Sequence, residues 1–168
     1  RALEMGGLNW LALAADRVRL ALALTIGDYV GVETVVDKAR RLFASSDRHR
    51  QERAMYAYAM ARSGWIRGRP EMIRAARLLI GEPLQNDRPD TIVTEAVIAA
   101  MVHRSEGDLA VAEARLEGVR DLQHSTRFCF VTGIVDLELA AIHLARGDRH
   151  GAVEVARPTL ELLADVGA

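Results

Sequence analysis

The chain has 168 residues, of which 50% are hydrophobic and 27% are charged, with a formal net charge of −1 at pH 7. These values are typical of a soluble globular protein that is long enough to bury a core. The small net charge gives no general attraction to nucleic acid or to an anionic membrane. The single cysteine, Cys129, excludes an intrachain disulfide and a cysteine-rich zinc site, and we expect it to be a small buried hydrophobe.

No apolar run reaches the roughly 18 residues that a membrane span needs. No basic-then-apolar signal segment opens the sequence either. We therefore expect a cytoplasmic protein that makes no membrane contact. Because the sequence opens on Arg1 and stops at "LADVGA", we also expect it to be a piece of a longer protein.

Four glycine-marked phrases divide the chain at nearly equal intervals. The glycines are Gly27, Gly68, Gly107 and Gly147, with separations of 68 − 27 = 41, 107 − 68 = 39 and 147 − 107 = 40. A period of roughly 40 residues lies in the range of helical repeat proteins. We expect each glycine to end a helix in the left-handed conformation, which glycine adopts at little cost.

The residue after each glycine is expected to begin the next helix. Asp28, Asp108 and Asp148 follow three of the glycines, and an aspartate can cap a helix by accepting hydrogen bonds from its free N–H groups. The second copy departs from this pattern and reads "IRGRPEMIR". There Pro70 suits the first helical position, and Glu71 favours the positive end of the helix dipole.

The segment before each glycine is apolar on most of its circumference, whereas the segment after it has a single apolar stripe. The preceding segments contain "LNWLALAADRVRLALAL", "RAMYAYAMA", "TIVTEAVIAAMV" and "FCFVTGIVDLELAAIHLA". The stripes comprise Tyr29, Val32, Val35, Val36, Ala39, Leu42 and Phe43; then Leu109, Ala112, Leu116, Val119 and Leu122; then Ala152, Val155, Ala156, Leu162, Leu163 and Val166. This pattern predicts helical hairpins whose first helix is the more enclosed, and no β-strand.

The predicted fold is all-α: about four antiparallel helical hairpins stacked as one right-handed superhelix, a single domain over residues 1–168. The polar turns "SSDRHR", "GEPLQNDRPD" and "QHST" separate the hairpins, and none is long enough to be a domain linker. Pro158 falls inside the last helix, where a proline removes an N–H and costs about 3 kcal/mol. We expect a kink or break just before it, and we favour a harmless bend near the end of the sequence as its only consequence.

The order of glycine, aspartate and, five residues past the glycine, alanine resembles the tetratricopeptide repeat. The residues that carry the resemblance are Gly107, Asp108 and Ala112, then Gly147, Asp148 and Ala152. The first copy has Val32 in place of the alanine. The period is longer than that of the standard tetratricopeptide repeat. In this the chain resembles the repeat region of large ATP-binding LuxR-type transcriptional regulators of the maltose-activator kind, and "RGDRHGAVEVARPTLELLADVGA" is especially similar to them.

The resemblance implies a function. In those regulators the repeat superhelix lies between a nucleotide-binding switch and a helix-turn-helix, senses an inducer or an inhibitory partner, and controls self-association. It implies a protein partner or a small-molecule inducer, homo-oligomer formation, and no direct contact with nucleic acid by this segment. The alternative is a protein-interaction scaffold of another signalling protein, such as a nucleotide-switch protein or a kinase.

Motifs of catalysis are missing from the sequence. Lys38 is the only lysine, so the phosphate loop G-x-x-x-x-G-K-[ST] cannot occur, and neither H-E-x-x-H nor G-x-S-x-G is present. We therefore expect a non-catalytic protein without a cofactor. An all-helical enzyme is the least favoured class.

A basic and aromatic patch is the preferred binding site. Trp65 lies in "SGWIRGRP", which is expected to be a loop that exposes the indole ring, and Arg62, Arg67 and Arg69 surround it. Tyr56, Tyr58 and Trp10 are further aromatic candidates, but we favour a role in filling the core between hairpins.

His103 and His143 are weaker candidates. They lie one period apart (143 − 103 = 40), and each stands four residues before its glycine. A ladder of histidines along a groove is one interpretation. Neighbouring hairpins are about 10 Å apart, which is too far for both side chains to bind one zinc ion. Structural packing is the favoured role.

Overall fold

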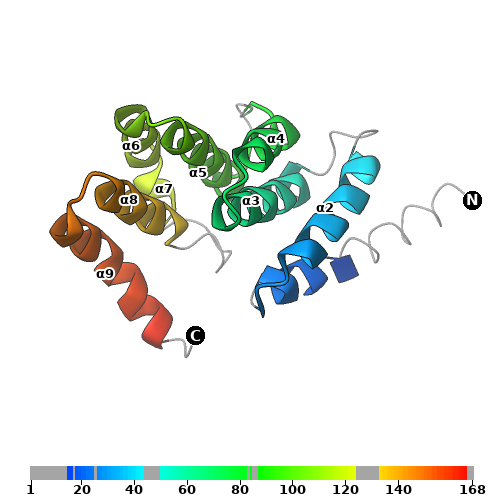
Figure 1. Ribbon diagram of the computed structural model, residues 1–168, viewed down its shortest axis with the longest axis horizontal. Coiled ribbons are helices and arrows are strands. Elements are labelled where there is room, and N and C mark those ends of the chain that lie inside the picture. Colours follow the sequence, from blue (N-terminus) through cyan, green and yellow to red (C-terminus); the bar gives the residue numbers. More distant parts are fainter. Residues whose placement is uncertain are drawn as a thin grey trace, which may run out of the picture. The chain divides into compact units, whose positions relative to one another are not determined.

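The computed structural model describes residues 15–16, 18–24, 26–43, 50–82, 84, 87–123 and 133–165. Its labelled elements are α2 (Tyr29–Phe43), α3 (Arg50–Ile66), α4 (Pro70–Ile80), α5 (Pro89–Ser105), α6 (Leu109–Glu117), α7 (Arg120–Gln123), α8 (Ile134–Ala145) and α9 (Arg149–Asp165) (Figure 1). A further helix precedes Gly27 and ends at Ile26. The described residues contain no β-strand, so the all-α prediction is confirmed.

Contacts group the chain into two compact units, Arg1–Leu79 and Ile80–Ala168. The first unit holds the helix before Gly27, α2, α3 and all but the last residue of α4. The second unit holds α5 to α9. The prediction of one continuous superhelix depends on how these units are joined, and it stays a prediction.

All four glycine-marked corners have the same backbone geometry. Gly27, Gly68, Gly107 and Gly147 have φ angles of 74°, 65°, 86° and 81°, so the predicted left-handed conformation is confirmed at each. The amide after each glycine donates to the carbonyl five residues earlier over 2.7 to 2.9 Å, and the glycine amide donates to the carbonyl three residues earlier. This pair of bonds is the Schellman motif, which satisfies carbonyl groups that a helix end leaves free.

Aspartate caps the following helix at two of the three predicted corners. The carboxylates of Asp28 and Asp148 accept hydrogen bonds from the amides of Gly31 and Gly151 over 2.9 and 2.8 Å. Asp108 precedes α6 but makes no side-chain capping bond, so the cap predicted there is wrong.

The residue three positions after the aspartate explains this difference. A Cβ atom added to Gly31 or Gly151 would lie 2.2 Å from the capping carboxylate, which therefore occupies space that only glycine leaves open. The third corner has Val111 at that position, so the carboxylate of Asp108 meets a Cβ atom where the other two meet none. At the second corner α4 begins at Pro70 with Glu71 in its first turn, as predicted.

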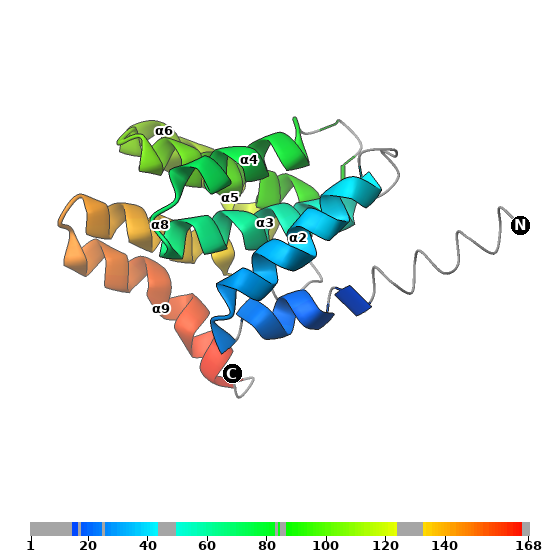
Figure 2. The ribbon, with the colours of Figure 1, turned by 45° about the vertical axis from the view of Figure 1, so that its right-hand side comes forward.

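The first helix is more enclosed than the second in the hairpins that begin with α3, α5 and α8, as predicted. In the first hairpin the prediction is wrong, because Val18, Leu22 and Ile26 are 70%, 58% and 66% exposed. In the second unit α5 packs against α6, α7 and α8, and it buries twelve of its 17 residues. By contrast, α6 buries two residues, Ala112 and Leu116. Figure 2 shows α8 and α9 side by side as the next hairpin of that unit. A helix that is apolar all round is therefore covered on several sides.

The stripe predicted on α2 is confirmed where the structure describes it, because Val32, Val36 and Ala39 are fully buried. The stripe after Gly107 predicts one helix from Leu109 to Leu122. This is wrong beyond Glu117, because α6 ends there and a separate short helix, α7, follows. Trp10, Cys129 and Val166 lie outside the described residues, as do the side chains of Leu42, Phe43 and Leu163.

Helix α9 continues through Pro158, so a break there is excluded and the kink stays a prediction. The proline has no N–H to donate to the carbonyl of Glu154, so the helix continues there without that one backbone bond. Leu162 of the predicted stripe is 45% exposed, and Thr159 is buried instead. Its hydroxyl donates to the carboxylate of Asp136 over 3.1 Å, which satisfies both polar groups away from water.

A buried ion pair joins α5 to α8. The Nη2 atom of Arg104 lies 2.7 Å from the Oε2 atom of Glu138, and each side chain is 4% exposed. Removing two charges from water costs several kcal/mol per ion, and their mutual attraction offsets that cost only while both are present. We therefore expect the pair to fix how α5 meets α8 more than to add net stability.

Replacing the corner glycine Gly107 by alanine is expected to lower the free energy of unfolding by about 1–2 kcal/mol. Its φ of 86° strains any residue with a Cβ, although nothing lies within 4 Å to clash with one. The control is Gly118→Ala, where φ is −61° and the nearest atom would lie 3.5 Å away. Urea unfolding followed by circular dichroism measures both, and equal losses in the two variants would contradict the left-handed assignment.

Replacing Glu138 by alanine is expected to destabilise the second unit by about 3 kcal/mol, because the buried Arg104 guanidinium loses its 2.7 Å ion pair with that carboxylate. The double variant Arg104→Met with Glu138→Leu should recover most of that loss, since it removes both charges and keeps the volume. Urea unfolding of the wild type and the two variants tests this. A double variant as unstable as the single one would argue against a paired, buried role.

Candidate functional site

A groove in the first unit is the best candidate for a binding site. It has a volume of about 250 Å³ and lies among α2, α3 and α4. Its lining residues are Glu33, Val36, Asp37, Arg40, Met60, Arg69, Glu71, Met72 and Ala75. The floor is apolar and the rim is charged, which is the usual arrangement of a site that binds a small molecule or a protruding side chain.

A glycine in α3 makes this groove possible. Gly64 is buried, and a Cβ atom there would lie 2.7 Å from the Cβ of Met72 and 2.9 Å from the carbonyl oxygen of Arg69. Only glycine allows α4 to cross α3 so closely. The close crossing sets Met72 of α4 and Met60 of α3 beside the same space, with Val36 of α2 as a third apolar wall.

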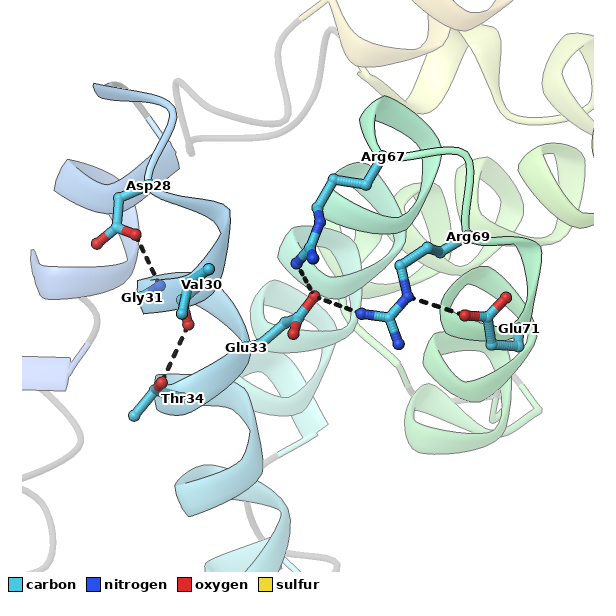
Figure 3. Close-up of polar contacts among 8 residues, drawn as sticks. All are labelled: Asp28, Val30, Gly31, Glu33, Thr34, Arg67, Arg69 and Glu71. Atoms are coloured by element: carbon cyan, nitrogen blue, oxygen red, sulfur yellow. Dashed lines mark hydrogen bonds and ion pairs between the residues drawn. The ribbon is translucent and has the colours of Figure 1, made fainter.

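One part of the rim is a chain of ion pairs. The carboxylate of Glu33 on α2 accepts hydrogen bonds from both Arg67 and Arg69, the latter over 3.0 Å (Figure 3). The Nε atom of Arg69 also donates to Glu71 over 2.9 Å. The hydrogen bond from Arg69 lowers the pKa of Glu71, and the same bond raises the pKa of the Arg69 guanidinium. Arg69 therefore links the start of α4 to α2, at the corner that joins α3 to α4.

The other part of the rim is more loosely paired. Asp37 and Arg40 lie one turn apart on α2, with their charged groups 3.8 Å apart and side chains 68% and 48% exposed. Within the described part of the chain, Arg40 makes this ion pair and no hydrogen bond. Exposed pairs of this kind contribute about 1 kcal/mol or less, so a ligand can replace either member at small cost.

The predicted basic and aromatic patch is only partly assembled. Trp65 is 40% exposed, but it lies in the last turn of α3, so the loop predicted for "SGWIRGRP" is wrong over its first half. Arg67 and Arg69 are neutralised by Glu33 and Glu71, and Glu33 was not among the residues predicted for the site. Arg69 is the one member of the patch that lines the groove, while Arg62 is half-buried on α3 with contacts of its own.

The other aromatic candidates in the described residues belong to α3. Tyr56 is fully buried, which confirms the core role favoured for it, and Tyr58 is half-buried. Neither residue lines the groove. These two tyrosines therefore pack within the hairpin, and the groove is lined mainly by methionines and charged residues.

The two histidines occupy equivalent corner positions but differ in their contacts. The backbone carbonyls of His103 and His143 each accept the long Schellman bond, over 2.9 Å in both cases. The Nδ1 atom of His143 also lies 2.8 Å from the carboxylate of Asp148, and no corresponding contact joins His103 to Asp108. Across the described ranges, no three histidine, cysteine or acidic side chains come together as metal ligands.

An ion pair like that of Glu33 and Arg67 recurs at the last corner. Arg146 donates two hydrogen bonds to the carboxylate of Glu113, over 2.9 and 2.7 Å. These hydrogen bonds from Arg146 lower the pKa of the Glu113 carboxyl group. In both cases the glutamate lies six residues after one corner glycine (33 − 27 = 6 and 113 − 107 = 6), and the arginine lies one residue before the next.

Comparing the repeats position by position would have found these pairs. Six residues after a corner glycine and one residue before the next, the charges are always opposite: Glu33 with Arg67, Arg74 with Glu106, and Glu113 with Arg146. The structure pairs the first and last sets. In the remaining set Arg74 belongs to the first unit and Glu106 to the second, so their opposite charges are noted only as a pattern in the sequence.

Comparisons with known proteins find no matching family model, no matching curated protein and no matching solved structure. In the part of the chain with described coordinates, no helix has both the length and the apolar character needed to cross a bilayer. The function is therefore inferred from the groove and from the repeated corners.

The Asp148 corner predicts a specific pH dependence of stability. The amide of Gly151, and then the ring of His143, hold the pKa of Asp148 below its ordinary value of 3.8. A carboxyl group with a lowered folded pKa stabilises the fold above its unfolded pKa and loses that effect as the pH falls through the folded pKa. Thermal unfolding of Asp148→Asn should therefore differ most from the wild type at neutral pH and converge with it below pH 3.8.

The matched control is Asp108→Asn, because Asp108 makes no side-chain capping bond at the equivalent corner. Its stability is expected to follow the wild type at every pH. If the two asparagine variants showed the same dependence, the contact of Asp148 with Gly151 and His143 would not be its cause.

Proposed function

We propose that this chain is a non-catalytic sensing and protein-interaction module, built as a tetratricopeptide-like superhelix of about four hairpins, from a cytoplasmic bacterial LuxR-type transcriptional regulator. The observation that carries the proposal is that the four corners share one backbone geometry. Each has a left-handed glycine and the same two backbone bonds, and the corners follow one another at nearly equal intervals along the chain. Repeats of this kind contact mainly their neighbours, and they present extended surfaces to ligands and partners.

The groove supports a sensing role. It lies between successive hairpins of the first unit, with Glu33 on α2 and Arg69 at the start of α4. A ligand that fills it contacts both hairpins at once, so it favours the angle between them that gives the best contacts. By population shift, such a ligand would move the parent protein from one association state toward another.

Thermal unfolding of the chain in the presence of pooled metabolites tests this proposal. A ligand present at ten times its Kd stabilises the folded state by about 1.4 kcal/mol and raises Tm by roughly 3–6 °C. The variant Ala75→Phe, which fills the groove, is expected to abolish that rise, whereas Ala114→Phe on the exposed side of α6 should retain it.

Three results would count against the sensor or against the groove as its site. A rise in Tm that persists in Ala75→Phe would place the ligand elsewhere, and catalytic turnover by the chain would contradict the non-catalytic role. No rise with any metabolite, together with binding of a defined protein, would favour the scaffold. The scaffold has one observation on its side: Trp65 and Ile66, at the end of α3, are 40% and 46% exposed.

A further inference from the structure

We propose that the ligand of the groove is a free amino acid, or a similar small zwitterion, with an apolar side chain. The inference rests on the proposed sensing function and names the chemical class of what is sensed. Three properties of the groove support it: its size, its floor and the charges on its rim.

The size of the groove sets the size of the ligand. A volume of about 250 Å³ holds about eight water-sized groups at roughly 30 Å³ each. Free leucine and free methionine are close to this size, because each has about nine non-hydrogen atoms. A nucleotide or a peptide helix is several times larger, and drug-sized ligands occupy pockets of about 300–1,000 Å³.

The floor of the groove selects an apolar side chain. Val36, Met60 and Met72 are 1%, 7% and 6% exposed, and Ala75 extends the same surface along α4. Burying an aliphatic side chain there removes apolar area from water on both partners. Methionine is flexible and polarisable, so two methionines can adapt to unbranched and branched side chains alike.

The charges on the rim match both ends of a zwitterion. Arg40 makes no hydrogen bond within the described part of the chain, and its guanidinium has the planar donors that bind a carboxylate through two parallel bonds. Asp37 lies one turn before Arg40 on α2 and lines the same groove, so its carboxylate can receive an ammonium group.

An exchange of partners makes the zwitterion a better fit than a single ion. Binding replaces the loose Asp37–Arg40 pair, whose groups are 3.8 Å apart, by two closer pairs with the ligand. A ligand with a carboxylate alone would contact Arg40 and separate Asp37 from its partner. A ligand with an ammonium alone would do the reverse. The zwitterion leaves neither residue without a partner.

Nuclear magnetic resonance of methyl-labelled methionine in the whole chain tests the proposal. Titration with L-leucine should shift the Met60 and Met72 signals, assigned through the single variants Met60→Leu and Met72→Leu, and leave the other three methionines unchanged. We expect a Kd on the order of 1 mM, since a ligand of this size has few atoms to contribute. The acid analogue 4-methylpentanoate and the amine analogue 3-methylbutylamine should each bind more weakly, by about tenfold or more.

Matched variants separate the charges of the rim from general effects of charge. Arg40→Gln and Asp37→Asn should each weaken leucine binding by about tenfold. Arg115→Gln and Asp121→Asn, both exposed in the second unit, should leave it unchanged. Circular dichroism of all four variants checks that each is folded. If their spectra match that of the wild type, a weakened binding comes from the changed charge at the groove and not from unfolding.

Equal binding of leucine and its acid analogue would overturn the zwitterion, and so would unchanged Met60 and Met72 signals with every apolar amino acid. These failures differ from failure of the sensing function. If another metabolite raises Tm in the wild type but not in Ala75→Phe, the groove senses a different class of ligand. Leucine binding that weakens in both rim variants, with the controls unchanged, supports the proposal.

Discussion

The reversal of the chain at a left-handed glycine is the constraint on which the rest of the structure depends. At each of the four corners a helix ends, two carbonyl groups receive backbone amides, and the next helix begins two residues later. Any other residue pays about 1–2 kcal/mol for that conformation, so glycine recurs where the chain must turn. Because the turns are short and alike, positions at equal distances from a corner meet equivalent surroundings.

Polar contacts recur at equivalent positions because of this regularity, but they differ in how much they contribute to stability. Glu33 with Arg67 and Glu113 with Arg146 are partly exposed pairs at equivalent positions, and such pairs contribute little net stability. They orient one hairpin relative to the next within a unit. The buried pair of Arg104 and Glu138 is different in kind, since leaving either charge alone in the interior is costly.

The corner that departs most from the repeat is the one beside the groove. The second copy has Arg69 and Pro70 where the other copies have aspartate and an ordinary residue. Arg69 is therefore free of the capping role, and it binds Glu33 and Glu71 at the rim. Gly64, five residues before Arg69, lets α4 approach α3 closely enough to set Met72 beside the groove. A site thus arises where the repeated pattern is broken.

The all-α class, the four corners, the start of α4 at Pro70 and the enclosure of α3, α5 and α8 could be predicted from the sequence. These features depend on local chemistry and on periodicity, which are both written along the chain. The tertiary structure alone decided that Asp108 does not cap, that α9 passes through Pro158, and that Thr159 replaces Leu162 in the interior. It alone also showed that Glu33 pairs with both Arg67 and Arg69 and that a groove lies beside Arg69, because both depend on which side chains meet across separate helices.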